Sequence, residues 1–286
     1  MNNWQNLLVL VLGIGFLTAL SRKWCLPGLA SGLLIIFGTI AAAAAGLFLA
    51  RVGLPFPVVA LGMWTTQLAG YTVGLLYQFY RDPERRPPNE SDALLSPADG
   101  KVIYIKKLPA GQILESEKKG RRLVLSELSG TDLSTHELWQ IGISMVFTDV
   151  HVNRAPIEGR VTMVKHRPGA FLSLRKEEAT NVNERQTMMI EKNGLQIALV
   201  QIASRLVRRI EAYVSEGEEV VLGQRIGIIK FGSQVDLFVP VAALSALNVK
   251  LDQQLTAGET IIGRAKRDTT MKLADAGAGV AVGARP

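Results

Sequence analysis

The sequence predicts a mainly β fold, a flattened β-sandwich of the barrel-sandwich hybrid kind, preceded by an α-helical transmembrane region. Three observations indicate this. Residues 1–80 are strongly apolar and contain no Asp or Glu. From Leu95 onward, short alternating runs rich in β-branched residues are typical of strands. Two turn-and-strand motifs each occur twice, as expected for a small fold with two sheets.

Three apolar runs fill the first part of the chain, at 4–20, 26–50 and 54–80. A helix needs roughly 20 apolar residues to cross a membrane. The second and third runs meet this length and the first is marginal, so we expect residues 1–80 to form two or three transmembrane helices. A cleaved signal peptide is the alternative for the first run, although residues 1–5 carry no lysine or arginine.

The distribution of charge predicts the location of the soluble part. Cations follow each apolar run: Arg22 and Lys23, then Arg51, then Arg81, Arg85 and Arg86. Because cytoplasmic flanks carry the excess of Lys and Arg, we expect the C-terminal domain on the cytoplasmic side of the cell (inner) membrane. The single cysteine, Cys25, excludes a disulfide framework. The net charge of +7 forms no basic stripe with interleaved aromatic residues, so nucleic acid is not an expected partner.

The soluble part begins with a polar, proline-rich segment at 80–88 and extends as one β domain over 81–268. Its first repeat pairs 96–106 with 155–165, both of which read Pro-x-acid-Gly-base-Val followed by alternation. A turn that feeds a strand explains both copies. Further strands are expected at 141–147 and 188–203. The tail, 269–286, is rich in Ala and Gly and is expected to be disordered.

The strongest candidate for chemistry is Phe231-Gly232-Ser233, which lies between predicted strands at 225–230 and 235–239. Glycine permits backbone conformations that a Cβ would forbid. If the Gly232–Ser233 bond is strained, the Ser233 hydroxyl can attack the Gly232 carbonyl and shift the acyl group from nitrogen to oxygen. A Gly-Ser bulge or hairpin in an ordinary sheet is the alternative.

Two further residues could support such a serine. His151 follows an apolar strand and precedes a turn, so it is expected at a strand end, whereas His136 and His166 are expected on the surface. Asp99 lies on a turn of the same domain. An acid, a base and a serine hydroxyl are the groups that nucleophilic acyl chemistry requires. One Cys and no His-x-x-x-His spacing predict no metal site.

Four ordered motifs carry a resemblance to a known family. They read Ser-Pro-Ala-Asp-Gly, Asp-Val-His-Val-Asn-Arg-Ala-Pro, Asn-Glu-Arg and Arg-Ile-Gly-Ile-Ile-Lys-Phe-Gly-Ser-Gln-Val-Asp. Together with Tyr-Arg-Asp-Pro-Glu-Arg before the domain, they resemble phosphatidylserine decarboxylase, in its short form with a Phe-Gly-Ser cleavage motif. The resemblance covers residues 78–265.

The resemblance implies a proenzyme that cuts itself between Gly232 and Ser233. A β chain of residues 1–232 and an α chain of residues 233–286 result, and Ser233 becomes a covalent pyruvoyl group. In this scheme Asp99 orients His151, and His151 takes the Ser233 proton. The pyruvoyl ketone then forms a Schiff base with the serine amine of phosphatidylserine, and loss of CO₂ gives phosphatidylethanolamine.

The resemblance also implies partners and substrate contacts. Phosphatidylserine in the membrane is the expected substrate, and Arg154, Asn183 and Arg185 are the expected substrate-binding residues. The α and β chains of one precursor are expected to stay together as partners. A homodimer of the protein is a further expectation. Arg154 stands where long-form members have a second histidine, and Gln234 stands where short-form members often have Arg.

Two alternatives to this function remain open at the level of sequence. A non-enzymatic, membrane-anchored β-sandwich adaptor would have the same anchor and the same hairpins. A decarboxylase of an ether-linked serine phospholipid would have the same catalytic residues. Only the first alternative leaves Gly232 and Ser233 without a role.

Overall fold

A computed structural model describes residues 3–24, 26, 28–112, 114–118, 121–125, 128, 131–168, 184–203, 209–230 and 234–266. The chain forms two compact units. One comprises residues 1–81 with 146–150, and the other comprises residues 82–145 with 151–286. Of the residues singled out above, Cys25, Asn183, Phe231, Gly232 and Ser233 lie outside the described residues, and so does the tail 269–286.

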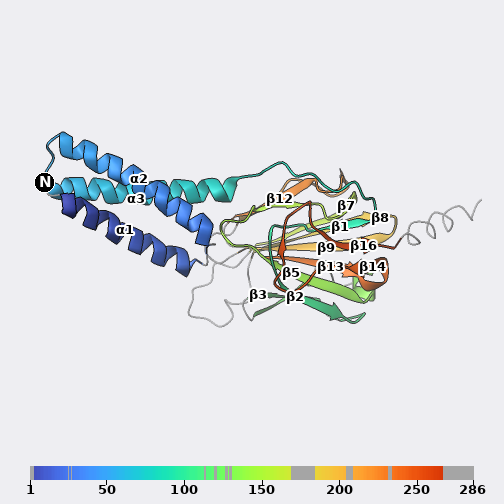
Figure 1. The fold of residues 1–286 in the computed structure, drawn as a ribbon. Helices are drawn as coiled ribbons and strands as arrows, with labels where there is room; N and C mark the ends of the chain where they lie inside the picture. The colour runs from blue at the N-terminus through green and yellow to red at the C-terminus, as the bar shows by residue number, and fades with distance from the viewer. Residues whose placement is uncertain are drawn as a thin grey trace, which may run out of the picture. The chain divides into compact units, whose positions relative to one another are not determined.

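The helical unit contains three helices, α1 (Asn3–Lys23), α2 (Gly28–Arg51) and α3 (Phe56–Tyr80), which lie side by side in Figure 1. Pro55 precedes α3, where its fixed φ suits a helix start. Helices α2 and α3 pack antiparallel through small residues. A Cβ added to Gly38 would lie 2.8 Å from the Gln67 carbonyl oxygen, and one added to Gly70 would lie 3.1 Å from the Gly38 Cα.

Polar side chains inside this unit bond to one another. Gln67 Nε2 donates to Thr39 Oγ1 at 2.9 Å, and the hydroxyls of Ser21 and Tyr71 are 2.8 Å apart. Within the described residues, α1 and α2 are long and apolar enough to cross a membrane. Helix α3 does not meet that test, because Thr65, Thr66 and Gln67 interrupt its apolar sequence. The number of membrane-spanning helices, two or three, therefore stays a prediction.

The segment Val146–Val150 belongs to the helical unit although it lies far along the chain. The Phe147 ring centroid is 4.9 Å from that of Phe79 and 6.4 Å from that of Trp24. The Asp149 carboxylate accepts the Val146 N–H at 2.7 Å and so closes a turn. The expected strand 141–147 is therefore displaced, because Phe147 packs on helices and the observed strand ends at Ser144.

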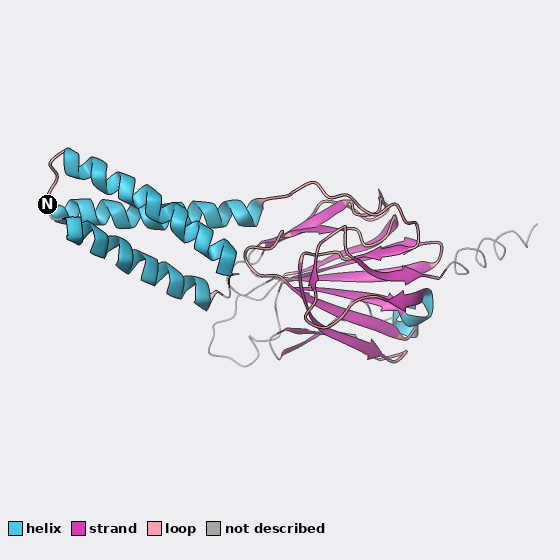
Figure 2. Ribbon diagram, viewed as in Figure 1, coloured by secondary structure: helices cyan, strands magenta, loops and turns pink. Residues whose placement is uncertain are grey.

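The second unit is the β domain, whose strands are the magenta arrows of Figure 2. The strands are β1 (Ala93–Leu95), β2 (Gly100–Leu108), β3 (Glu115–Lys118), β4 (Arg121–Val124), β5 (Leu138–Ser144), β6 (Val152–Arg154), β7 (Gly159–Arg167), β8 (Arg185–Lys192), β9 (Leu195–Ile202), β10 (Arg209–Ala212), β11 (Glu219–Val220), β12 (Arg225–Lys230), β13 (Gln234–Pro240), β14 (Leu244–Leu247), β15 (Gln254–Leu255) and β16 (Ile261–Ala265). Two 3₁₀ turns, Asp132–Thr135 and Val241–Ala243, complete the described elements.

Among the described strands, one large antiparallel sheet has the order β11-β7-β8-β9-β13-β5-β2-β15. Two three-stranded sheets have the orders β10-β12-β6 and β1-β16-β14, and β3 pairs with β4. A main core, which includes Val235 and Leu237 of the large sheet and Ile226 and Ile262 of the small sheets, lies between these layers. A second core covers the other face of the large sheet and includes Phe238. The predicted β-sandwich after a helical region is confirmed.

The repeated Pro-x-acid-Gly motif has the same physical role in both copies. Gly100 starts β2 and Gly159 starts β7, with φ of +140° and +144°. A Cβ at either position would meet a backbone carbonyl oxygen, that of Ser144 at 2.4 Å or that of Glu191 at 2.2 Å. Only glycine fits both the conformation and the space.

The expected strand 188–203 is instead a hairpin. Strands β8 and β9 pair along their whole length, from Arg185 opposite Ile202 to Lys192 opposite Leu195. Asn193 and Gly194 form the turn with φ of 50° and 78°. Asn-Gly is the sequence that a two-residue hairpin turn favours.

The close contact between α2 and α3 generates a prediction. Gly38→Ala should lower the free energy of unfolding of the helical unit by about 1–3 kcal/mol, because the added methyl overlaps the α3 backbone. The matched control is Gly32→Ala on the same helix, where an added Cβ has no atom within 4 Å. Loss of helical circular dichroism during an SDS titration of the full chain in detergent measures both changes. Equal stability of the two variants would contradict this packing.

Candidate active site

The segment Phe231–Ser233 connects strands of two different sheets. Strand β12, which ends at Lys230, lies between β10 and β6. Strand β13, which begins at Gln234, lies between β9 and β5 in the large sheet. Since β12 and β13 are not partners, the hairpin alternative for the Gly-Ser pair is excluded. Three residues carry the chain from one sheet to the other.

The structure places His151 beside the end of β12. Strand β6 pairs with β12, with Val152 opposite Ile228. The carbonyl of His151 accepts the Ile229 N–H at 3.2 Å, and His151 is fully buried. Ser233 follows Ile229 by four residues in the chain. His151 thus directly precedes β6, where a strand begins instead of the expected turn, and its catalytic role stays a prediction.

The other two histidines have local acidic partners. His136 Nε2 is 3.6 Å from the Asp132 carboxylate, and both side chains are exposed. His166 Nε2 lies 2.8 Å from Glu184 Oε1, an atom that also accepts the Ile210 N–H. The Glu184 partner of His166 has no signal in the sequence, because the two residues are 18 positions apart.

The turn that contains Asp99 contacts β6. The Pro97 carbonyl accepts the Arg154 N–H at 2.9 Å and the Asn153 side-chain amide at 3.2 Å. The Asp99 carboxylate itself accepts two bonds from Arg85 Nη2, at 2.9 and 3.2 Å, and the Ala257 N–H at 2.7 Å. The proposed orientation of His151 by Asp99 therefore stays a prediction, while Arg85 emerges as the partner of Asp99.

Arg154 is buried on β6 and points toward the start of the domain. Its Nη1 donates to the Gly223 carbonyl at 3.1 Å, and its Nη2 donates to Asp82 and to the Pro83 carbonyl, both at 3.1 Å. Burial, followed by repulsion from Arg225, lowers the pKa of Arg154, and Asp82 opposes this shift. In the structure Arg154 binds the chain itself, so its contact with substrate stays a prediction.

Residues 82–88, which we call the collar, are held to the β domain by ion pairs. Arg225 bonds Asp82 at 2.5 Å and Glu84 at 2.8 Å, and these hydrogen bonds raise the pKa of Arg225. Arg85 Nη1 is 3.3 Å from Glu259, which also accepts the Arg86 N–H. The short run in which the acids Asp82 and Glu84 are followed by the base Arg85 is a sequence signal that could have indicated this network.

Arg185 lies in the sheet row where β13 begins. Register places Arg185 opposite Ile202, Ile202 opposite Gln234, and Gln234 opposite Ser144. Directly opposed side chains of antiparallel strands project from the same face, so Arg185 and Gln234 share a face two strands apart. Arg185 Nη2 donates to the Val124 carbonyl at 3.1 Å. Its predicted contact with substrate is not tested by this geometry.

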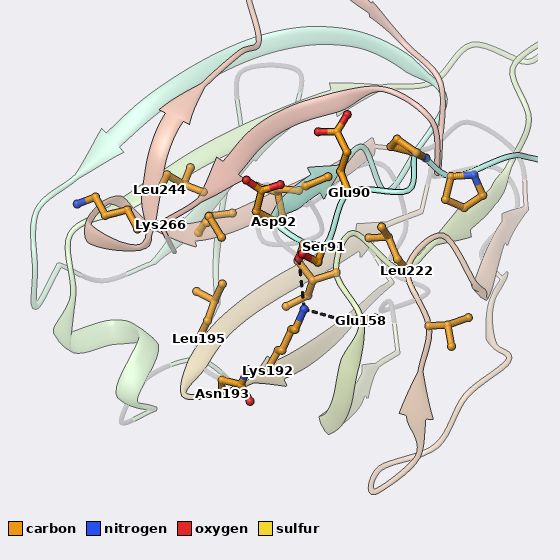
Figure 3. A pocket seen from close by; sticks show the side chains of 18 of the residues that line it. Glu90, Ser91, Asp92, Glu158, Lys192, Asn193, Leu195, Leu222, Leu244 and Lys266 are labelled. Carbon is orange, nitrogen blue, oxygen red and sulfur yellow. Dashed lines mark hydrogen bonds and ion pairs between the residues drawn. The ribbon is translucent and has the colours of Figure 1, made fainter. Parts of the chain in front are cut away.

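A cavity of about 680 Å³ lies elsewhere in the β domain (Figure 3). Its lining includes apolar residues such as Leu195, Leu222 and Leu244, but neither Asp99 nor His151. Lys192 there bonds Glu158 at 2.5 Å and the Ser91 carbonyl at 3.3 Å. The cavity therefore lacks the residues that the sequence analysis singled out for chemistry.

The fold and these contacts define a class: a β domain that follows an apolar helical unit and sets a buried histidine against the strand leading to a Gly-Ser pair. The model of the family described as phosphatidylserine decarboxylase matches residues 74–263. The chain belongs to this family, whose members are enzymes.

Curated relatives are similar over most of their length, and each is named "Phosphatidylserine decarboxylase proenzyme". The protein of Erythrobacter litoralis (strain HTCC2594) is 38% identical over 212 residues, which cover 72% of this chain and 80% of the relative. The protein of Novosphingobium aromaticivorans is 37% identical over 208 residues, covering 71% and 78%. The protein of Pelobacter propionicus is 37% identical over 187 residues, covering 65% and 74%.

The pair of Arg85 with Asp99 generates a prediction. The two side chains are only 14% and 11% exposed. Arg85→Ala should therefore cost about 3–5 kcal/mol of unfolding free energy, because it leaves a nearly buried carboxylate without its counter-charge. Arg86→Ala, at the exposed neighbouring position, should change it by no more than about 0.5 kcal/mol. Urea unfolding of the β domain in the full chain measures both, and a loss of under 1 kcal/mol for Arg85→Ala would contradict the assignment.

Proposed function

We propose that the chain is a proenzyme that cuts itself between Gly232 and Ser233 and then decarboxylates phosphatidylserine to phosphatidylethanolamine and CO₂. One observation carries the proposal: the pairing of β6 with β12 sets buried His151 beside the strand that leads into Gly232 and Ser233. Membership of the family and the word "proenzyme" in the names of the relatives support it.

The proposed cleavage uses groups of the chain and one water molecule. His151 takes the proton of the Ser233 hydroxyl, and Oγ attacks the Gly232 carbonyl carbon. The peptide C–N bond breaks, which leaves an ester and a free amine on residue 233. Loss of the α proton then expels the Gly232 carboxylate and leaves a dehydroalanine. Water hydrolyses this group to a ketone and releases ammonia, so residue 233 ends as a pyruvoyl group.

The described residues fit a pyruvoyl group at position 233. Gln234, the next residue, is held by strands on both sides, opposite Ser144 and Ile202. It is only 3% exposed, so the group would start from a fixed point. The ketone supplies an electron sink for the carboxylate that leaves. His151 is the proposed donor of the proton that replaces it.

The remaining site residues are assigned roles within the same proposal. Asp99, held by Arg85 and the Ala257 N–H, supports the turn that contacts β6 and acts on His151 from there. Arg185 shares a sheet face with Gln234. Among the described residues, it is the one we assign to bind the phosphate of the lipid head group. Arg154 and Asn183 complete the proposed substrate contacts.

We also propose that all three helices cross the inner membrane. Helix α2 is apolar enough to do so, and α3 packs antiparallel to it, from Gly74 against Leu34 to Gly62 against Leu49. Three crossings place Arg22, Lys23 and the β domain on one side. The positive charge at the α1 end makes that side cytoplasmic.

Replacement of the serine tests the cleavage. Wild-type protein should yield a fragment of residues 233–286 that resists Edman degradation, because a ketone replaces its amine. Ser233→Ala should give only the full-length chain and no decarboxylation. The control is Ser245→Ala, whose exposed hydroxyl bonds the Arg264 carbonyl, and it should cleave normally. A Ser233→Ala chain that is still cut would overturn the assignment of Ser233.

Replacement of the histidine tests its assigned role. His151→Ala should slow cleavage by at least about 100-fold, the contribution typical of a general base. His136→Ala, at an exposed position, should leave the rate unchanged. Quantification of the full-length and cut chains on a denaturing gel over time measures both. Equal rates for the two variants would remove His151 from the mechanism.

A further inference from the structure

A buried carboxylate lies on β13 close to the cleavage position, and none of the roles assigned so far uses it. Asp236 is fully buried. Its Oδ2 accepts the Tyr104 hydroxyl at 2.5 Å and Gln140 Nε2 at 3.0 Å. Its Oδ1 accepts Gln234 Nε2 at 2.9 Å, and Gln234 Nε2 is also 3.0 Å from the Tyr104 hydroxyl.

The sheet builds this cluster from three neighbouring strands. Asp236 of β13 is opposite Gly142 of β5, and Gly142 is opposite Tyr104 of β2. A Cβ on Gly142 would lie 2.4 Å from Tyr104 Cζ. The tyrosine ring therefore crosses β5 over the one residue that has no side chain. The glycine allows a hydroxyl from β2 to reach a carboxylate on β13.

Burial of this carboxylate is costly unless its oxygens are hydrogen-bonded. Three side-chain donors, from Tyr104, Gln140 and Gln234, bond it here. Bonds to an ionised group are stronger than those between neutral groups. The arrangement therefore fixes the side chain of Gln234, the first residue of β13, more firmly than backbone pairing alone would.

Cleavage between Gly232 and Ser233 makes the bonds that hold Gln234 more important for the position of residue 233. In the uncut chain, residue 233 is linked to β13 directly and to β12 through residues 231 and 232. After the cut, it is bonded to β13 alone, at the new end of a strand. Strand ends open locally unless they are tied down. Because consecutive Cα atoms are about 3.8 Å apart, the position of Gln234 then decides the position of residue 233.

We propose that Tyr104, Gln234 and Asp236 form a clamp that holds the new N-terminus of the small chain in place for decarboxylation. These three side chains position residue 233 and do not touch the substrate. The inference rests on the proposed cleavage between Gly232 and Ser233. The clamp acts after the cut, so its loss leaves cleavage intact and lowers the turnover of the cut enzyme. Substrate binding depends on other residues, so KM changes little.

Two conservative variants test the clamp. Tyr104→Phe removes one hydroxyl, and Gln234→Glu keeps the size of the side chain but replaces a donor with an acceptor facing Asp236. Both chains should cleave fully. Each should show kcat for phosphatidylserine in detergent micelles lower by about 10- to 100-fold, the cost of a small misplacement of a reacting group, with KM within about twofold. Hydrogen exchange at the start of the small chain should be faster.

Matched controls and a rescue complete the experiment. Tyr213→Phe changes an exposed tyrosine, and Gln196→Ala changes a glutamine that bonds Glu191 at the far end of β9. Both should leave kcat unchanged. Gln234→Glu combined with Asp236→Asn restores one donor and one acceptor and should recover most of kcat.

The outcomes separate this inference from the proposed function. An uncut wild-type chain would refute the proposed function itself. With the wild type cut, unchanged kcat in both Tyr104→Phe and Gln234→Glu would overturn the clamp. Failure of both variants to cleave would also overturn it, because the cluster would then act in the precursor. Lower kcat with full cleavage, faster exchange and rescue supports it.

Discussion

The arrangement of the site depends on one topological constraint: strands β12 and β13 belong to different sheets, yet three residues connect them. Each strand is fixed independently. Strand β12 is fixed by β10 and β6, and β13 by β9 and β5. The two strands on either side of the Gly232–Ser233 bond are therefore positioned by different sheets and not by pairing with each other.

The same layers bring the remaining groups to this connection. Strand β6 sets His151 against β12, and the Pro97 carbonyl joins the Asp99 turn to β6 through Asn153 and Arg154. The collar is then fastened to that turn by Arg85 and to β6 by the bond from Arg154 to Asp82. The collar, the turn that contains Asp99 and strand β6 thus form one hydrogen-bonded and ion-paired assembly.

Local signals in the sequence predicted the parts that depend on neighbouring residues. The alternation at 225–230 predicts the bounds of β12, Arg225–Lys230. The repeated Pro-x-acid-Gly motif predicts two turns, and both of its glycines have positive φ. The predicted strand 141–147 includes Phe147, which packs on helices instead. The sequence alone does not distinguish an apolar residue that packs on helices from one in the core of a sheet. The Asn193-Gly194 turn was missed inside an apolar run. The Asp236 cluster could not be predicted, since Tyr104 and Gln140 are 132 and 96 residues away from it.

The central claim is that the bond between Gly232 and Ser233 is cut and leaves a ketone on residue 233. Intact-mass measurement of the active protein, before and after borohydride reduction, tests this most directly. Two chains are expected, of which the small one begins at residue 233, lacks an amine there and gains two hydrogens on reduction. A single uncut chain that still converts phosphatidylserine would contradict the account.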